Sequence, residues 1–271
     1  MKILVCMKQV PAGTKVDIDP ETGAMKRLSG ETRTNPYDLF ALEAALQLRE
    51  KVGGSVTVLT MGPPQAEEMM RDAYTMGADD AVILSDRKFA GADVLATSYA
   101  LSQGITAIGD IDLIICGKQT TDGDTAQVGP AIAEHLGIPH AAWVSEIVDA
   151  DSESIQVKQD LVSVSQTSKI PYPCLITVDK DMCVPRLPSY LLQKQSKDRP
   201  VKIMTFEDMA DQNLSKYGLV GSPTAVEKMF APPEVDMYEK GKEEGIKQGI
   251  IEKSKEKTKQ LFDVLVNKKV I

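Results

Sequence analysis

Short apolar runs alternate with segments of helical periodicity along the N-terminal part of the chain. Apolar runs predict buried strands at 2–6, 55–60, 81–84, 113–116 and 174–178. Apolar residues at helical spacing predict helices at 35–52, 65–76, 91–108 and 128–136. This alternation predicts an α/β fold, a doubly wound and mainly parallel sheet with helices on both faces. Ligands of such sheets bind outside the carboxyl ends of the strands, near the point where the strand order reverses.

Three further regions break this alternation. Residues 16–28 follow an alternating pattern around a Pro-Glu-Thr-Gly turn, which predicts a small antiparallel excursion. After Pro139 the apolar runs become short and predict antiparallel strands at 141–148, 155–157 and 161–164. A last strand is expected at 202–206 and a short helix at 223–230.

The C-terminal part of the chain is more polar than the rest. Pro232 and Pro233 mark a linker, and residues 239–270 have the composition of one charged helix. Such a helix is either solvated or lies on a partner, and its length and the linker favour a partner. We therefore divide the chain into an α/β nucleotide-binding domain, 1–198, and a C-terminal arm that binds a partner, 199–271.

Composition and charge exclude several classes of protein. The net charge is −8, whereas a nucleic-acid-binding protein usually carries a basic face. No run of 18 apolar residues is present, so no membrane-spanning helix is expected, and the N-terminus is too short and too β-like for a signal peptide. We therefore expect a cytoplasmic protein. None of the four cysteines forms a C-x-x-C pair and the two histidines have no partner motif, so no metal site is predicted.

The stretch from Leu113 to Pro130 combines an apolar strand, a polar loop and the start of a helix. In this arrangement the N–H groups of the first helical turn, expected at Thr125 to Gly129, and the helix dipole point at a bound phosphate. Asp124 and Thr125 are good capping residues, so an ordinary turn followed by an ordinary cap explains the same residues. The stretch lacks the P-loop and dinucleotide fingerprints, and no catalytic residues are predicted. The residues thus indicate an adenine-nucleotide site without a catalytic triad.

Several segments together resemble the β subunit of electron-transfer flavoproteins, over residues 1–233. They are VCMKQVP, NPYDLFALEAALQLRE, LTMGPPQAEE and GKQTTDGDTAQVGP. The last of these, with VDKDMCVPRLPSY and YGLVGSPTAVEKMF, resembles the flavin-bifurcating group. The resemblance implies an adenine-nucleotide α-hydrolase-like sheet. Residues 157–168 depart from the family pattern, which affects a local hairpin rather than the nucleotide site.

The resemblance also implies which residues bind the cofactor. Ordinary members hold an AMP in this site, and bifurcating members hold the AMP half of an FAD. The adenosine is expected against Cys6, Asn35, Pro36, Tyr37, Asp38 and Met61. The isoalloxazine is expected near residues 7–11, which include Met7 and Val10. The phosphates are expected against Asp122, Gly123, Asp124, Thr125, Gln127, Val128, Gly129 and Pro130. A bulky residue in place of Gly129 is expected to block the phosphate and release the flavin.

The function implied by the resemblance is electron transfer in a heterodimer with an α subunit. NADH would reduce the β-subunit FAD, and the electrons would divide between ferredoxin and a partner flavin dehydrogenase of the acyl-CoA dehydrogenase or lactate dehydrogenase type. The segment with Leu187, Pro188 and Tyr190 matches the family's docking loop for that dehydrogenase, although a plain Pro-rich turn is the alternative.

Two other functions stay open. One is a non-bifurcating carrier with AMP in the site, and the other is a non-redox nucleotide-binding module. An adenylating enzyme ranks last, because the first strand is not followed by a pyrophosphate loop.

Overall fold

The computed structural model describes residues 1–12, 17–18, 25–26, 32–161, 163–180 and 182–224, with single positions at 258, 259, 263 and 266. Residues 1–19 and 25–227 form one compact unit; residues 20–24 and 228–271 form a second. The second unit lies outside the described residues apart from the four single positions, which are helical. The predicted helices at 223–230 and 239–270 therefore fall largely outside the described residues.

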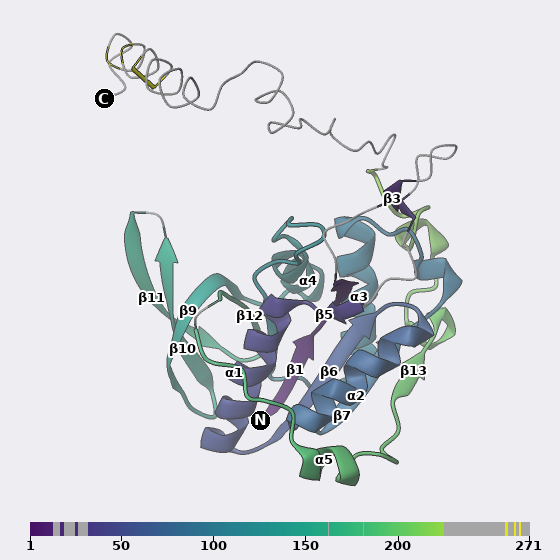
Figure 1. The fold of residues 1–271 in the computed structure, drawn as a ribbon, viewed down its shortest axis with the longest axis horizontal. Helices are drawn as coiled ribbons and strands as arrows, with labels where there is room; N and C mark the ends of the chain where they lie inside the picture. The colour runs from purple at the N-terminus through teal and green to yellow at the C-terminus, as the bar shows by residue number, and fades with distance from the viewer. Residues whose placement is uncertain are drawn as a thin grey trace, which may run out of the picture. The chain divides into compact units, whose positions relative to one another are not determined.

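The first unit is built on one large sheet, drawn in Figure 1 with helices in front of it and behind it. Its strand order is β11-β10-β9-β12-β8-β1-β6-β7-β13. The strands are β1 (Lys2–Cys6), β6 (Ser55–Met61), β7 (Asp80–Leu84), β8 (Leu113–Gly117), β9 (His140–Ala150), β10 (Ser154–Leu161), β11 (Val164–Pro171), β12 (Cys174–Val178) and β13 (Lys202–Met204). The pairs from β9 through β12, β8, β1, β6 and β7 to β13 are all parallel. The α/β class and the mainly parallel sheet are confirmed.

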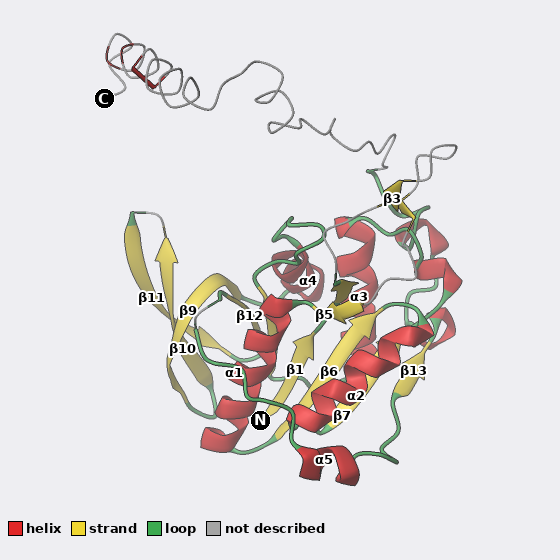
Figure 2. Ribbon diagram, viewed as in Figure 1, coloured by secondary structure: helices red, strands yellow, loops and turns green. Residues whose placement is uncertain are grey.

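Helices cover both faces of this sheet, as Figure 2 shows in red against yellow strands. They are α1 (Pro36–Val52), α2 (Glu67–Met76), α3 (Val94–Ile108), α4 (Val128–Leu136) and α5 (Tyr190–Gln195), with short 3₁₀ turns at Pro64–Ala66, Arg87–Phe89, Phe206–Asp208 and Leu214–Lys216. Buried side chains of α1 and α2, such as Leu42 and Met70, pack with Val5 on one face. Leu101 of α3 and Ile132 of α4 pack with Leu4 on the other. Successive strand residues therefore point to opposite faces of the sheet and pack in two separate apolar layers.

Two small antiparallel sheets complete the described fold. The strands β2 (Gln9–Pro11) and β5 (Thr32–Thr34) pair with each other, as do β3 (Asp17–Ile18) and β4 (Met25–Lys26). The β3–β4 pair is the excursion predicted at 16–28.

Several predicted boundaries need correction. The strand predicted at 161–164 is wrong, because Leu161 ends β10 and Val164 begins β11, so the hairpin bends there. The helix predicted from 91 begins at Val94, because the Asp93 carboxylate accepts the Ala96 N–H at 3.1 Å and caps it. Helix α5 was not predicted, although Ser189 accepts the Leu192 N–H as its N-cap.

The predicted domain boundary at residue 198 falls inside the first compact unit. Strand β13 pairs in parallel with β7 and forms one edge of the sheet. The Tyr217 side chain is 1% exposed and packs with Phe89 and Phe206. The chain up to this point therefore belongs with the sheet.

Candidate functional site

The strand order reverses between β1 and β8. From β1 the chain builds β6 and β7 on one side, and then returns to place β8 on the other side of β1. Cys6 at the end of β1 lies beside Cys116 near the end of β8. The segments that leave these two strands diverge here, which is where doubly wound sheets bind ligands. The loop from β8 to α4, residues 118–127, begins at this point.

Asn35 connects the start of α1 to the β8–α4 loop. Its side chain donates to the Gln119 carbonyl at 2.9 Å and accepts the Thr121 N–H at 3.1 Å. The residue is fully buried, and its own N–H donates to the Lys8 carbonyl at 2.9 Å. Asn35 occupies the N-cap position of α1, but its side chain makes no cap hydrogen bond and instead holds the loop.

Replacing Asn35 with Ala should loosen the loop. The Gln119 carbonyl and the Thr121 N–H would lose their partner in a part-buried setting, at a cost of about 1–2 kcal/mol in the free energy of unfolding. Peptides that cover residues 117–127 should exchange their amide hydrogens faster, as measured by hydrogen–deuterium exchange with mass spectrometry. The matched control is Asn213→Ala, because Asn213 is exposed and only caps a local turn through Ser215. Equal exchange of the loop in both variants would contradict the tether.

Asp38 joins the ends of β1 and β8 to the first turn of α1. Its side chain is buried, and its Oδ2 accepts the Lys8 N–H at 2.7 Å. The Gly117 N–H and the Asn35 side chain also donate to it. Burial raises the pKa of Asp38 to about 7, against these hydrogen bonds and the charge of Lys8, which lower it.

Gly117 is required for the close approach of α1 to β8. A Cβ built on it would lie 2.4 Å from the Asp38 Oδ1 and 2.7 Å from the Tyr37 carbonyl carbon. Because the second contact is with backbone, a rotamer change cannot relieve it. The end of β8 therefore fits against α1 only with glycine at this position.

The β8–α4 loop is held by ion pairs and by unusual backbone angles. Lys8 Nζ contacts both carboxylate oxygens of Asp122, at 2.8 and 2.7 Å. Burial raises the pKa of Asp122, but the hydrogen bonds from Lys8 and Thr120 lower it more, so the net shift is downward. Asp124 and Ala126 have positive φ values of 50° and 54°, outside the usual range for residues other than glycine. Left-handed residues other than glycine are uncommon and cluster at functional sites.

Helix α4 begins beside this loop and points its N-terminus at the same edge. It starts at Val128, and Gln127 occupies the N-cap position without a side-chain cap hydrogen bond. The expectation that Asp124 or Thr125 caps the helix is therefore wrong; the Asp124 carboxylate instead accepts Gln119 Nε2 at 3.0 Å. The first N–H groups of a helix have no partner within it, and Pro130 has none to offer. The N–H groups of Val128 and Gly129 are thus the donors of this turn.

The structure gives a reason for glycine at position 129 that differs from the predicted close approach of a phosphate. A Cβ on it would lie 2.5 Å from the Thr177 Cγ2 on β12. Thr177 cannot rotate freely, because its hydroxyl oxygen accepts the Trp143 N–H at 2.9 Å. Glycine therefore lets α4 sit close to the sheet, and a larger residue would displace the helix start rather than only fill the phosphate position.

The structure brings most of the predicted adenosine residues to this edge. Cys6 and Met61 are partly exposed at the ends of β1 and β6, Pro36 opens α1, and Tyr37 lies against Gly117. Met7 and Val10 are buried, at 4% and 1% exposure, so neither presents a free side-chain surface there.

Two residues at this edge were missed in the sequence. Lys8 and Gln119 tie the loop together through Asp122 and Asp124. The Lys8–Asp122 contact joins residues 114 positions apart, and the Gln119–Asp124 contact lies within the loop. Neither follows from the apolar and polar pattern along the chain.

Cys6 and Cys116 are neighbours on the paired strands β1 and β8. Both cysteines are free, and the hydrogen bond to Cys6 together with burial raises the pKa of the Cys116 thiol. The raised pKa keeps the Cys116 thiol protonated, and this thiol packs in the core as a small apolar side chain.

The predicted partner-binding residues lie away from this edge. Leu187 and Tyr190 are 87% and 71% exposed, and Pro188 is exposed between them. The segment crosses α1 at Glu43 and Glu50 and reaches the end of α2, where the Ser189 N–H donates to the Thr75 carbonyl. Helix α1 therefore has contacts with the β8–α4 loop at its start and contacts with this segment farther along.

Within the part of the chain that the structure describes, no group of three or more His, Cys, Asp or Glu side chains is placed to hold a metal ion. A search of the same residues found no helix with the length and apolarity needed to cross a membrane. At the β1–β8 edge, the first N–H groups of α4 are backbone donors of the kind that can bind an anionic group.

The sequence is similar to one protein family and to several characterised proteins. The electron transfer flavoprotein domain matches residues 22–210. The chain is 46% identical to protein FixA of Azorhizobium caulinodans, over 86% of this chain and 85% of that protein. It is 43% identical to the electron transfer flavoprotein subunit beta of Clostridium acetobutylicum, over 84% and 87%. It is also 43% identical to the caffeyl-CoA reductase-Etf complex subunit CarD of Acetobacterium woodii, over 86% and 88%.

Proposed function

This chain belongs to the electron transfer flavoprotein family, as a β subunit, and we propose that it holds the AMP portion of an FAD at the β1–β8 edge. The observation that carries the proposal is the shared position of three features at the reversal of strand order. These are the open N-terminus of α4, the left-handed loop before it, and the buried Asn35 that fixes this loop.

The residues present fit an adenine dinucleotide. The Val128 and Gly129 N–H groups and the helix dipole favour phosphate oxygens. Lys8 adds positive charge to the edge, shared with Asp122. Cys6 and Met61 offer soft, partly exposed surfaces at the strand ends on which an adenosine can rest. FAD, when bound, supplies the redox chemistry by accepting electrons in pairs and releasing them singly.

We further propose that the chain works in a heterodimer with an electron-transfer flavoprotein α subunit, and that the complex bifurcates electrons. NADH is the donor, and ferredoxin and a flavin dehydrogenase are the acceptors. The motif GKQTTDGDTAQVGP and the likeness to a subunit of a caffeyl-CoA reductase-Etf complex support this. An ordinary carrier with AMP in the site is the alternative. A cytoplasmic location accompanies the proposal.

The flavin dehydrogenase is proposed to dock on residues 184–190, which we name the docking loop. Val184, Leu187 and Tyr190 expose large apolar side chains there, at 86%, 87% and 71%. A few residues carry most of the binding energy of a protein interface, and Tyr is enriched among them. The Val184 and Leu187 side chains add exposed apolar area beside Tyr190. The C-terminal arm, which lies largely outside the described residues, is proposed to pack on the α subunit.

The test is the cofactor content of the co-purified αβ heterodimer. We expect two FAD per heterodimer and no AMP, measured by acid extraction and chromatography against standards. One FAD and one AMP would overturn bifurcation and leave the ordinary carrier. A colourless monomer that binds ATP would overturn electron transfer and favour a non-redox nucleotide-binding module.

A further inference from the structure

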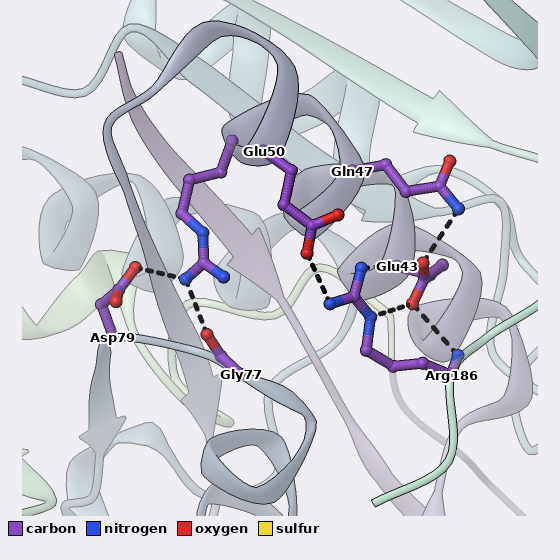
Figure 3. Close-up of polar contacts among 7 residues, drawn as sticks. Glu43, Gln47, Glu50, Gly77, Asp79 and Arg186 are labelled. Carbon is purple, nitrogen blue, oxygen red and sulfur yellow. Dashed lines mark hydrogen bonds and ion pairs between the residues drawn. The ribbon is translucent and has the colours of Figure 1, made fainter. Parts of the chain in front are cut away.

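The docking loop is fixed to helix α1 by one arginine. Arg186 Nε donates to Glu43 Oε2 at 2.8 Å, its Nη2 to Glu43 Oε1 at 3.1 Å, and its Nη1 to Glu50 Oε1 at 2.7 Å. The Arg186 N–H also donates to Glu43 Oε2, at 3.0 Å. Figure 3 shows the guanidinium lying between the two carboxylates of α1. Backbone and side chain of one residue are thus held by the same helix.

The Glu43 carboxylate is buried, and its hydrogen bonds keep it charged. It is 3% exposed, and its second partner, Gln47 on the same helix, donates to Oε1 at 2.9 Å. Burial raises the pKa of Glu43, but the hydrogen bonds from Arg186 lower it more, so the carboxylate stays charged. A buried carboxylate needs a fixed counter-charge, and the planar fork of arginine meets both of its oxygens.

The contact immediately precedes the most exposed part of the loop. Leu187 follows Arg186 directly, and its side chain packs little against the rest of the protein, with 87% of its surface exposed. Two residues later, the Ser189 N–H donates to the Thr75 carbonyl at 2.8 Å. Hydrogen bonds of Arg186 and Ser189 therefore hold the loop on both sides of Leu187, whose side chain is exposed between them.

We propose that Arg186 is a positioning residue that holds Leu187 ready for the flavin dehydrogenase. The inference rests on the proposed docking function. Ordering a loop before binding removes part of the entropy cost of association, so the effect falls on the affinity for the dehydrogenase. Because the start of α1 also carries Asn35 and Asp38, the same helix sets where the docking loop stands relative to the nucleotide edge.

The experiment uses the αβ heterodimer with NADH as donor. The acceptor is a purified flavin dehydrogenase, of the acyl-CoA or lactate class, whichever the wild-type heterodimer reduces. The main variant is the double substitution Arg186→Gln with Glu43→Gln, which leaves no unpaired buried charge. We expect the KM for the dehydrogenase to rise about tenfold with kcat nearly unchanged. Flavin content and NADH-driven reduction of a small dye should stay at wild-type values.

Two further variants make the result specific. Arg71→Gln removes an arginine that pairs with Glu67 on α2 and donates to the carbonyls of Lys197 and Arg199. These contacts do not involve the docking loop, so the KM of this variant should not change. Leu187→Ala should raise the KM by itself, and adding the double substitution to it should change the KM little further, because Arg186 acts through Leu187.

The possible contrary results distinguish failure of the docking function from failure of the positioning role of Arg186. If Leu187→Ala leaves the KM unchanged, or if neither class of dehydrogenase is reduced, the proposed docking function fails. If Leu187→Ala raises the KM but the Arg186–Glu43 double substitution does not, the positioning role fails. Fully additive effects, or loss of flavin in the double variant, would also overturn it, because Arg186 would then act elsewhere.

Discussion

A single methyl group added at Gly117 should empty the nucleotide site. In Gly117→Ala the new Cβ meets the Asp38 carboxylate and the Tyr37 backbone, at 2.4 and 2.7 Å. The start of α1 must move away from β8, and with it the Asn35 contacts that hold residues 119–121. We expect a loss of about 3 kcal/mol in the free energy of unfolding. We also expect most of the FAD to be lost during purification of the heterodimer, as measured by flavin absorbance per protein.

The matched control is Gly62→Ala, after the end of β6. There a Cβ meets only the Ala66 Cβ, at 3.6 Å, which is an ordinary contact. The same chemical change should therefore leave both stability and flavin content near the wild-type values. If the two variants hold equal amounts of flavin, the junction of α1 with β8 does not support the nucleotide site. Urea unfolding of both variants separates loss of cofactor from loss of fold.

Much of this edge could be predicted from the sequence because it consists of local patterns. Apolar runs located β1, β6 and β8, and the polar loop before Val128 indicated a phosphate position at a helix start. The parallel order then follows from the alternation of strands and helices. What could be predicted was therefore the place of the site and the segments that meet there.

The contacts that fix the site could not be predicted. Asn35 is a typical N-cap residue by sequence, yet its side chain bonds a loop far along the chain. Gly129 follows a phosphate-type loop, yet the close contact of its Cβ position is with Thr177 on another strand. Likewise Arg186 and Glu43 are joined across 143 residues. Pairings of this kind depend on how elements pack, which no local pattern contains.

The pH dependence of stability should identify Asp38. Its pKa is about 7 in the folded protein, against 3.8 for an unperturbed Asp. Between these values the folded state holds a proton that the unfolded state has released, so stability falls as the pH rises. From pH 5 to pH 8 this one group should remove about 3 kcal/mol from the free energy of unfolding. The measurement is urea unfolding at several pH values, for wild type and Asp38→Asn.

The difference between the two proteins isolates the group. Asp38→Asn loses some hydrogen bonding at every pH, but that offset has no slope, so its curve should be flatter from pH 5 to pH 8. Asp122→Asn is the control, because the lowered pKa of Asp122 keeps it ionised throughout that range, and its removal leaves the slope unchanged. Parallel curves for wild type and Asp38→Asn would show that Asp38 is already ionised at pH 5.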